Sequence, residues 1–168
     1  MPALARKITP FLWFDTQAEQ AARFYTAIFS NSRINQISRY GAAGNETHGK
    51  DAGSVMTVAF EIEGQNLVAL NGGPHFKFNE AVSFQITCET QDEIDYFWSR
   101  LSDGGEESRC GWLKDKFGLS WQVVPAILPH LLMDDDKAKS ERAMSALLQM
   151  KKLDIAALQR AHAGAGQA

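Results

Sequence analysis

The 168-residue chain has few of the features that mark disulfide-rich, membrane-spanning or nucleic-acid-binding proteins. Its two cysteines, Cys88 and Cys110, are too few for a disulfide framework and fit a reducing compartment. No run approaches ~18 consecutive apolar residues, so no transmembrane helix is expected. With 17 basic and 20 acidic residues the formal net charge is −3, which argues against a strongly basic nucleic-acid binder. We therefore expect a soluble cytoplasmic protein that binds neither nucleic acid nor membrane.

The sequence does contain a repeated pattern within an ordinary globular composition, which is 45% hydrophobic and 22% charged. The segment Thr16–Glu19 recurs 74 positions later as Thr90–Glu93. Each copy follows a strand-like run and precedes a helix-like run. Thr-x-x-Glu is the capping box, in which the Thr and Glu side chains bind amide groups at the start of a helix. The pattern predicts two strand–helix units, each with a capping box.

Similar strands are expected after each helix. In the first half they lie at 34–40, 54–62 and 65–71, with a turn at Glu63–Gly64, and in the second half at 106–110, 111–114 and 119–124. The sequence thus predicts an α+β fold with two βαβββ modules, at about 7–72 and 80–125. A single helix leaves one face of each sheet uncovered, so pairing the modules would bury that face or enclose a half-barrel-like cleft. We expect one domain over residues 1–126.

Residues 127–164 form a separate helical extension in this interpretation. Asp134–Asp136 and Asp154 are expected helix starts, because acidic residues favour helix N-termini. The apolar faces of these helices require a partner, which is either the rest of the same chain or a second subunit. Because the extension lies outside the duplicated unit, we favour a role in a homodimer.

The strand expected at 82–88 indicates where a ligand could bind. Val82, Phe84, Ile86 and Cys88 alternate with Ser83, Gln85 and Thr87, so the apolar row would pack under the helix and the polar row would face the cleft. A merely solvated polar face is the alternative. Small-molecule clefts combine aromatic side chains with a few polar groups. On that basis the candidate ligand-binding residues are Trp13, Asn71, Gln85, Trp112, Lys114, Trp121 and Gln122. Core or interface positions are the alternative for the tryptophans, and no catalytic residue is identified.

Several sequence segments together resemble one protein family. They include Ile8–Phe14, Ala18–Tyr25, Ala69–Pro74, Cys110–Asp115 and Trp121–Pro125. They resemble the PhnB-like branch of the vicinal oxygen chelate superfamily, which includes glyoxalase I, bleomycin-resistance proteins and extradiol dioxygenases. Members of this branch are often labelled 3-demethylubiquinone-9 3-methyltransferase. The resemblance spans about residues 7–160 and implies paired βαβββ modules and a homodimer.

The resemblance also raises the question of a metal cofactor. Enzymes of the superfamily hold a divalent metal with His, Glu or Gln from the first and last strands of each module, and the metal acts as a Lewis acid. The position near Thr9–Pro10 carries no such residue here. The candidates that remain are Gln85 and Gln122, with His75 in a loop. Amides are weaker ligands than carboxylates or imidazoles, so no tight metal site is expected.

Two classes of function therefore stay open. One is a protein that binds a small molecule, for example an aromatic one, in a cleft without a tight metal. The other is a divalent-metal-dependent lyase, isomerase or dioxygenase that acts on a small oxygenated substrate. Methyl transfer, which the family label suggests, is a third reading. The sequence offers it no glycine-rich cofactor turn, because Gly41–Gly44 leads into Asn45–His48, a segment not expected to be helical.

Overall fold

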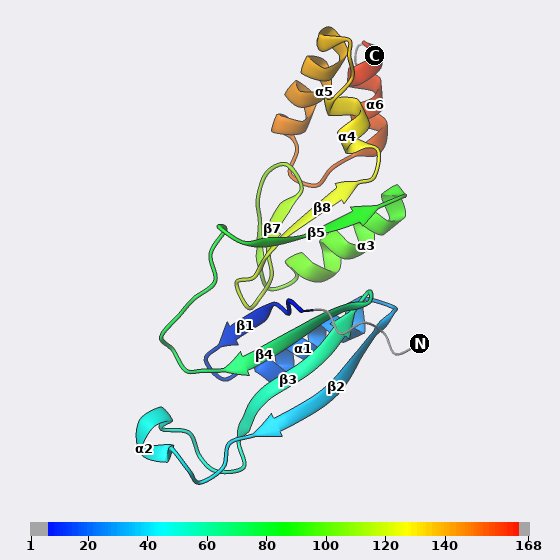
Figure 1. Cartoon of the computed structure of the whole chain (residues 1–168). Coiled ribbons are helices and arrows are strands. Elements are labelled where there is room, and N and C mark those ends of the chain that lie inside the picture. Colours follow the sequence, from blue (N-terminus) through cyan, green and yellow to red (C-terminus); the bar gives the residue numbers. More distant parts are fainter. Residues whose placement is uncertain (1–6, 165–168) are drawn as a thin grey trace. The chain divides into compact units, whose positions relative to one another are not determined.

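The computed structural model describes residues 7–164, which divide into two compact units with a boundary between Lys77 and Phe78. Each unit contains one four-stranded mixed sheet and one helix of three turns packed against it (Figure 1). The second unit also contains three C-terminal helices. The predicted α+β fold with two βαβββ modules and C-terminal helices is therefore confirmed.

The first unit follows the predicted order with one added helical turn. Its elements are β1 (Phe11–Phe14), α1 (Ala18–Ile28), β2 (Ser32–Arg39), α2 (Asn45–His48), β3 (Val55–Ile62) and β4 (Gln65–Asn71). The strands lie in the order β1-β4-β3-β2, with β1 parallel to β4. The prediction that residues 45–48 are not helical is wrong. Gly44 and Gly49 flank this single turn with φ of 83° and 62°, a left-handed conformation that glycine adopts without strain.

The second unit repeats the same topology. Its module consists of β5 (Ser83–Cys88), α3 (Gln91–Ser102), β6 (Glu106–Glu107), β7 (Trp112–Lys114) and β8 (Ser120–Pro125), in the sheet order β5-β8-β7-β6. Strand β6 is shorter than the predicted 106–110. The amides of Cys110 and Gly111 donate to the carbonyl oxygens of Met150 and Lys151, both at 2.8 Å, so this segment pairs outside the sheet.

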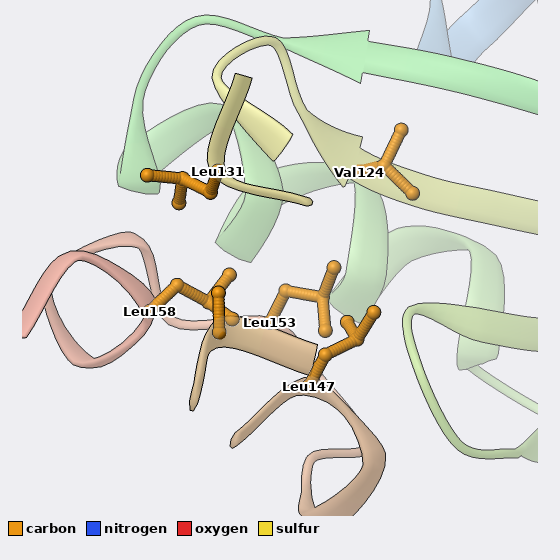
Figure 2. Packing of buried hydrophobic residues seen from close by; sticks show 6 residues of the cluster. Val124, Leu131, Leu147, Leu153 and Leu158 are labelled. Carbon is orange, nitrogen blue, oxygen red and sulfur yellow. The ribbon is translucent and has the colours of Figure 1, made fainter. Parts of the chain in front are cut away.

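The C-terminal extension packs within the second unit. It comprises α4 (Leu128–Leu132), α5 (Lys137–Gln149) and α6 (Ile155–Ala163). The predicted helix starts are confirmed, because Asp136 and Asp154 accept hydrogen bonds from first-turn amides of α5 and α6. Figure 2 shows the apolar cluster that joins these helices to the end of β8, formed by Val124, Leu131, Ala143, Leu147, Leu153 and Leu158. These faces thus find a partner in their own unit, and the homodimer stays a prediction.

The two modules start their helices differently. In α3 the threonine half of the predicted capping box is confirmed, because the Thr90 hydroxyl accepts from the Glu93 amide at 3.2 Å. The Glu93 carboxylate accepts at 2.6 Å from the amide of Glu89, one residue before the N-cap amide that the box predicts. In α1 the predicted box is wrong. The N-cap residue is Gln17, whose side chain makes no capping bond. Instead Asn71, at the end of β4, accepts from the Ala18 amide at 2.8 Å.

None of the helices described between residues 7 and 164 is long and apolar enough to cross a membrane.

Candidate functional site

The second sheet has one face in the core of its unit. Alternation along β8 places Trp121 and Val123 on this face, and both are buried against α3 and its neighbours. The Trp121 side chain is 2% exposed, and its indole N–H donates to the Asp115 carboxylate at 2.9 Å. The predicted ligand-binding residue Trp121 therefore lies on the opposite face of the sheet from Gln122.

The other face of this sheet, which we call the open face, brings three of the predicted residues into one row. Gln85 of β5 is in register with Gln122 of β8, and Gln122 is in register with Trp112 of β7. Side chains at paired positions of neighbouring strands point to the same face, so these three lie side by side. Gln85 is exposed, and Gln122 and Trp112 are half-buried. We call this row the amide–indole row.

The two amides of the row use their N–H groups within the fold. The Gln122 Nε2 donates to the Ser83 hydroxyl at 2.9 Å, and the Gln85 Nε2 lies 3.4 Å from the Thr87 hydroxyl. These bonds orient the side chains. Within the described part of the chain, neither Gln85 Oε1 nor Gln122 Oε1 accepts a hydrogen bond. Both oxygens can therefore accept from a ligand.

A second row on the same face carries charge. Ser83, Ser120 and Lys114 are in register across β5, β8 and β7, and Glu106 of β6 follows Lys114. The Lys114 ammonium lies 2.5 Å from the Glu80 carboxylate. The bond to Glu80 raises the pKa of Lys114, and the bond to Lys114 lowers the pKa of Glu80. Both groups are consequently charged at neutral pH.

The predicted residues of the first unit have roles within that unit. The Trp13 indole donates to the Gly73 carbonyl oxygen at 2.8 Å and packs edge-on against Phe76. A Cβ atom at Gly72 would collide with the Trp13 ring, so only glycine allows this approach. Trp13 therefore fixes the segment that follows β4, while His75 in that segment is exposed.

Asn71 is a structural residue that sequence reasoning assigned to the cleft. It is 7% exposed, its side-chain oxygen accepts from Ala18, and its amide donates to the Val55 carbonyl oxygen at 3.0 Å. Both ends of the side chain are thus occupied by backbone groups.

The residues present do not fit the divalent-metal site of the superfamily. Between residues 7 and 164 no group of three or more His, Cys, Asp or Glu side chains is placed to hold a metal ion. On the open face of the second sheet, Gln85 and Gln122 supply only neutral amide donors. Divalent cations prefer carboxylates or imidazoles.

The two cysteines do not add a nucleophile to the open face. Cys88 is fully buried on the core face, and this burial raises the pKa of its thiol to about 12. The thiol is therefore protonated at neutral pH, which leaves no thiolate to react. Cys110 is half-buried and packs against the apolar cluster of the C-terminal helices.

Comparisons with known proteins agree with this architecture. The family model described as 3-demethylubiquinone-9 3-methyltransferase matches residues 6–124. A solved structure of a putative 3-demethylubiquinone-9 3-methyltransferase, PhnB protein, from Bacillus cereus is 36% identical. The match covers 72% of this chain and 100% of that one, with a TM-score of 0.64. Helices α4 to α6 lie beyond the end of the family model.

Two more distant structures share the fold alone. Protein PA1353 from Pseudomonas aeruginosa is 16% identical with a TM-score of 0.56, over 70% of this chain and 96% of that one. The fosfomycin resistance protein FosX from Listeria monocytogenes, in its monoclinic form, is 14% identical with a TM-score of 0.51, over 76% and 96%. No curated protein matches the chain. On the family match and the 36% identity, the chain belongs to the PhnB-like 3-demethylubiquinone-9 3-methyltransferase family.

Proposed function

We propose that the protein binds a small molecule with an aromatic or other flat apolar part on the open face of its second sheet, without a tightly held metal. The observation that carries this proposal is the amide–indole row of Gln85, Gln122 and Trp112. Ligand sites combine apolar surface with a few placed polar groups, and this row offers both.

Each member of the row has a distinct task in this proposal. The half-buried Trp112 indole supplies a flat apolar surface on which a ring can stack. The side-chain oxygens of Gln85 and Gln122 accept hydrogen bonds from N–H or O–H groups of the ligand. Because Ser83 holds the Gln122 amide in one orientation, little side-chain entropy is lost on binding.

The proposal includes no tightly held metal because of the chemistry of the side chains on this face. Two neutral amides make a weak site for a divalent cation. The family name mentions methyl transfer, but no described residue of this face favours a methyl-donor site, so methyl transfer is not part of the proposal.

The test is a screen of planar aromatic compounds that carry N–H or O–H groups, read by protein NMR. A binder should shift the amide signals of residues 85, 112 and 122. The Gln122→Ala variant should weaken its binding about two- to tenfold, the usual effect of losing one neutral hydrogen bond. Gln36→Ala is the matched control, because Gln36 is an exposed strand glutamine of the first unit.

Two results would contradict the proposal. A screen without any binder that shifts these signals would remove the ligand site. Retention of about one divalent ion per chain after dialysis against Mn, Fe, Ni or Zn would remove the metal-free interpretation and favour the metal-dependent enzyme.

A further inference from the structure

A small pocket opens on the same face of the second sheet, next to the charged row. It has a volume of about 170 Å³, and its lining includes Trp112, Lys114, Ser120, Glu80 and Glu106. Pockets for drug-sized ligands measure about 300–1,000 Å³, so this one is smaller. The pocket thus has the size of a molecular fragment or of one functional group of a larger ligand.

One residue that lines this pocket, Ser120, has a buried hydroxyl group with no bonding partner in the described residues. Ser120 is 1% exposed, and its Oγ makes no hydrogen bond to any group between residues 7 and 164. Of its neighbours across the sheet, the Ser83 hydroxyl accepts a hydrogen bond from Gln122, and the Lys114 ammonium pairs with Glu80. Buried polar atoms are nearly always hydrogen-bonded, so an unsatisfied one that lines a pocket indicates a missing partner.

The charges around the pocket decide which partner fits. The carboxylates of Glu80 and Glu106 line it against the single ammonium of Lys114, whereas the Glu107 carboxylate accepts from the Trp98 indole at 2.9 Å and lies 4.0 Å from the Lys151 ammonium. Glu80 pairs closely with Lys114, whereas the Glu106 carboxylate lies 4.0 Å from the Lys114 ammonium. The lining therefore carries an excess of negative charge, which repels anions and attracts cations.

The indole of Trp112 also favours a cation over an anion. Cations are attracted to the face of an aromatic ring, and the effect is largest for tryptophan. Trp112 lies at the boundary between the amide–indole row and the pocket, since it belongs to both.

We infer that this pocket binds a small organic ammonium group, and that Ser120 Oγ accepts a hydrogen bond from it. The excess carboxylate charge and the Trp112 indole select the cation, and the buried hydroxyl of Ser120 fixes its position. The inference goes beyond the proposed function, because the pocket can bind an amine whether or not the amide–indole row binds an aromatic ring.

The test uses three two-carbon probes of similar size and different charge: ethanolamine as the cation, ethylene glycol as the neutral molecule and glycolate as the anion. Each is titrated into the full chain at constant ionic strength, and amide shifts are followed by NMR. Ethanolamine should saturate shifts at Lys114 and Ser120 with at least tenfold higher affinity than glycolate, and ethylene glycol should lie between them. Equal affinity for ethanolamine and glycolate, or no saturable shift at these amides, would overturn the inference.

Ser120→Ala tests the hydrogen bond. It should weaken ethanolamine binding about tenfold or more, as expected for one bond to a charged group. Ser32→Ala is the matched control, because Ser32 Oγ is also buried without a partner in residues 7–164 but does not line this pocket. Unchanged affinity in Ser120→Ala would show that the hydroxyl does not hold the ammonium group and would refute its assigned role.

Glu106→Gln tests the charge independently of the core. The Glu106 side chain is 78% exposed, so this variant should fold even if Ser120→Ala does not. It should weaken ethanolamine binding several-fold and leave ethylene glycol binding unchanged. A loss of the same size for both probes would exclude charge selection by this carboxylate. Because these probes carry no ring, their outcome is separate from that of the aromatic screen.

Discussion

The two modules share one strand order and differ in how each starts its helix. In the second module, Thr90 caps α3 from within the same stretch of sequence. In the first, Asn71 reaches back from β4 to cap α1. Asn71 is in register with Phe14, and the corresponding position of the second module is Pro125, in register with Cys88. Proline has no side-chain acceptor, so only a local cap can serve there. The same topology thus supports a local and a long-range solution.

The open faces of the two sheets differ as well. The first sheet presents Phe11 and Trp13 on β1 and Val68 and Leu70 on β4, and Thr57 of β3 and Gln36 of β2 share this face. The second presents Ser83 and Gln85 on β5, Ser120 and Gln122 on β8, and Lys114 on β7. Where the two parallel strands of each sheet pair, their residues on this face are therefore apolar in the first module and mainly polar in the second.

Asn71→Ala should have a large effect on the first module and tests its long-range cap. This change leaves the Ala18 amide and the Val55 carbonyl without their partners in the core. We expect the first unit to lose about 2–4 kcal/mol, since each buried unsatisfied group costs about 1–3 kcal/mol. Urea unfolding measures the loss. Asn71→Asp keeps the acceptor for Ala18 and should lose less, and a loss below about 0.5 kcal/mol in Asn71→Ala would contradict the long-range cap.

Thr90→Ala should have a smaller effect, because it removes one local capping bond at a helix end that is exposed to water. The expected loss is about 1 kcal/mol, typical of a threonine N-cap. Urea unfolding, followed by a probe in the second unit, gives the value. Thr90→Ser keeps the hydroxyl and should restore most of it, and a Thr90→Ser protein as unstable as Thr90→Ala would refute the capping role.

Thr16→Ala tests whether the first module lacks a local threonine cap. Thr16 stands where the first capping box was predicted, but α1 begins after Gln17 and makes no side-chain cap. Removal of the Thr16 hydroxyl should change stability by less than about 0.5 kcal/mol, as for most surface positions. Equal losses of stability in Thr16→Ala and Thr90→Ala, measured by urea unfolding, would contradict the difference in capping between the two modules.

The Glu80–Lys114 pair of the second unit should make a small, pH-dependent contribution to stability. Lys114 lowers the pKa of Glu80 from 4.5, so the stabilisation is complete above pH 4.5 and is lost as the pH falls through the lowered pKa. Glu80 raises the pKa of Lys114 from 10.5, so the stabilisation is complete below pH 10.5 and is lost above the raised pKa. Thermal unfolding of Glu80→Gln and of the natural chain should differ between these limits and converge at acidic pH. A difference that grows on acidification would contradict this.

The fold could be predicted closely where short-range signals decide it. Alternation and turn residues located β4, and acidic residues located the starts of α5 and α6. The cap of α1 could not be predicted in this way, because its acceptor lies 53 positions along the chain. The end of β6 depends similarly on Met150 and Lys151, which belong to a distant segment.

The candidate site could be predicted in part, for the same reason. Residue type alone indicates Gln85, Gln122 and Trp112 as side chains that suit a cleft. The strand register then brings these three together. Trp121 was grouped with them, although neighbouring residues of a strand point to opposite faces. The alternation that separates Trp121 from Gln122 also places Ser120 on the side of Gln122, so this signal could have identified Ser120.

The Asn71 cap has a consequence for the order of folding. Helix α3 carries its starting signal within its own sequence, so its first turn can form before the sheet is assembled. Helix α1 receives its cap only when β4 has returned beside β1, which requires closure of a long loop. Contacts between distant residues slow folding because the entropy of loop closure is lost before they form. We therefore expect α3 to become protected from hydrogen exchange early during refolding, and the start of α1 to become protected only together with the first sheet.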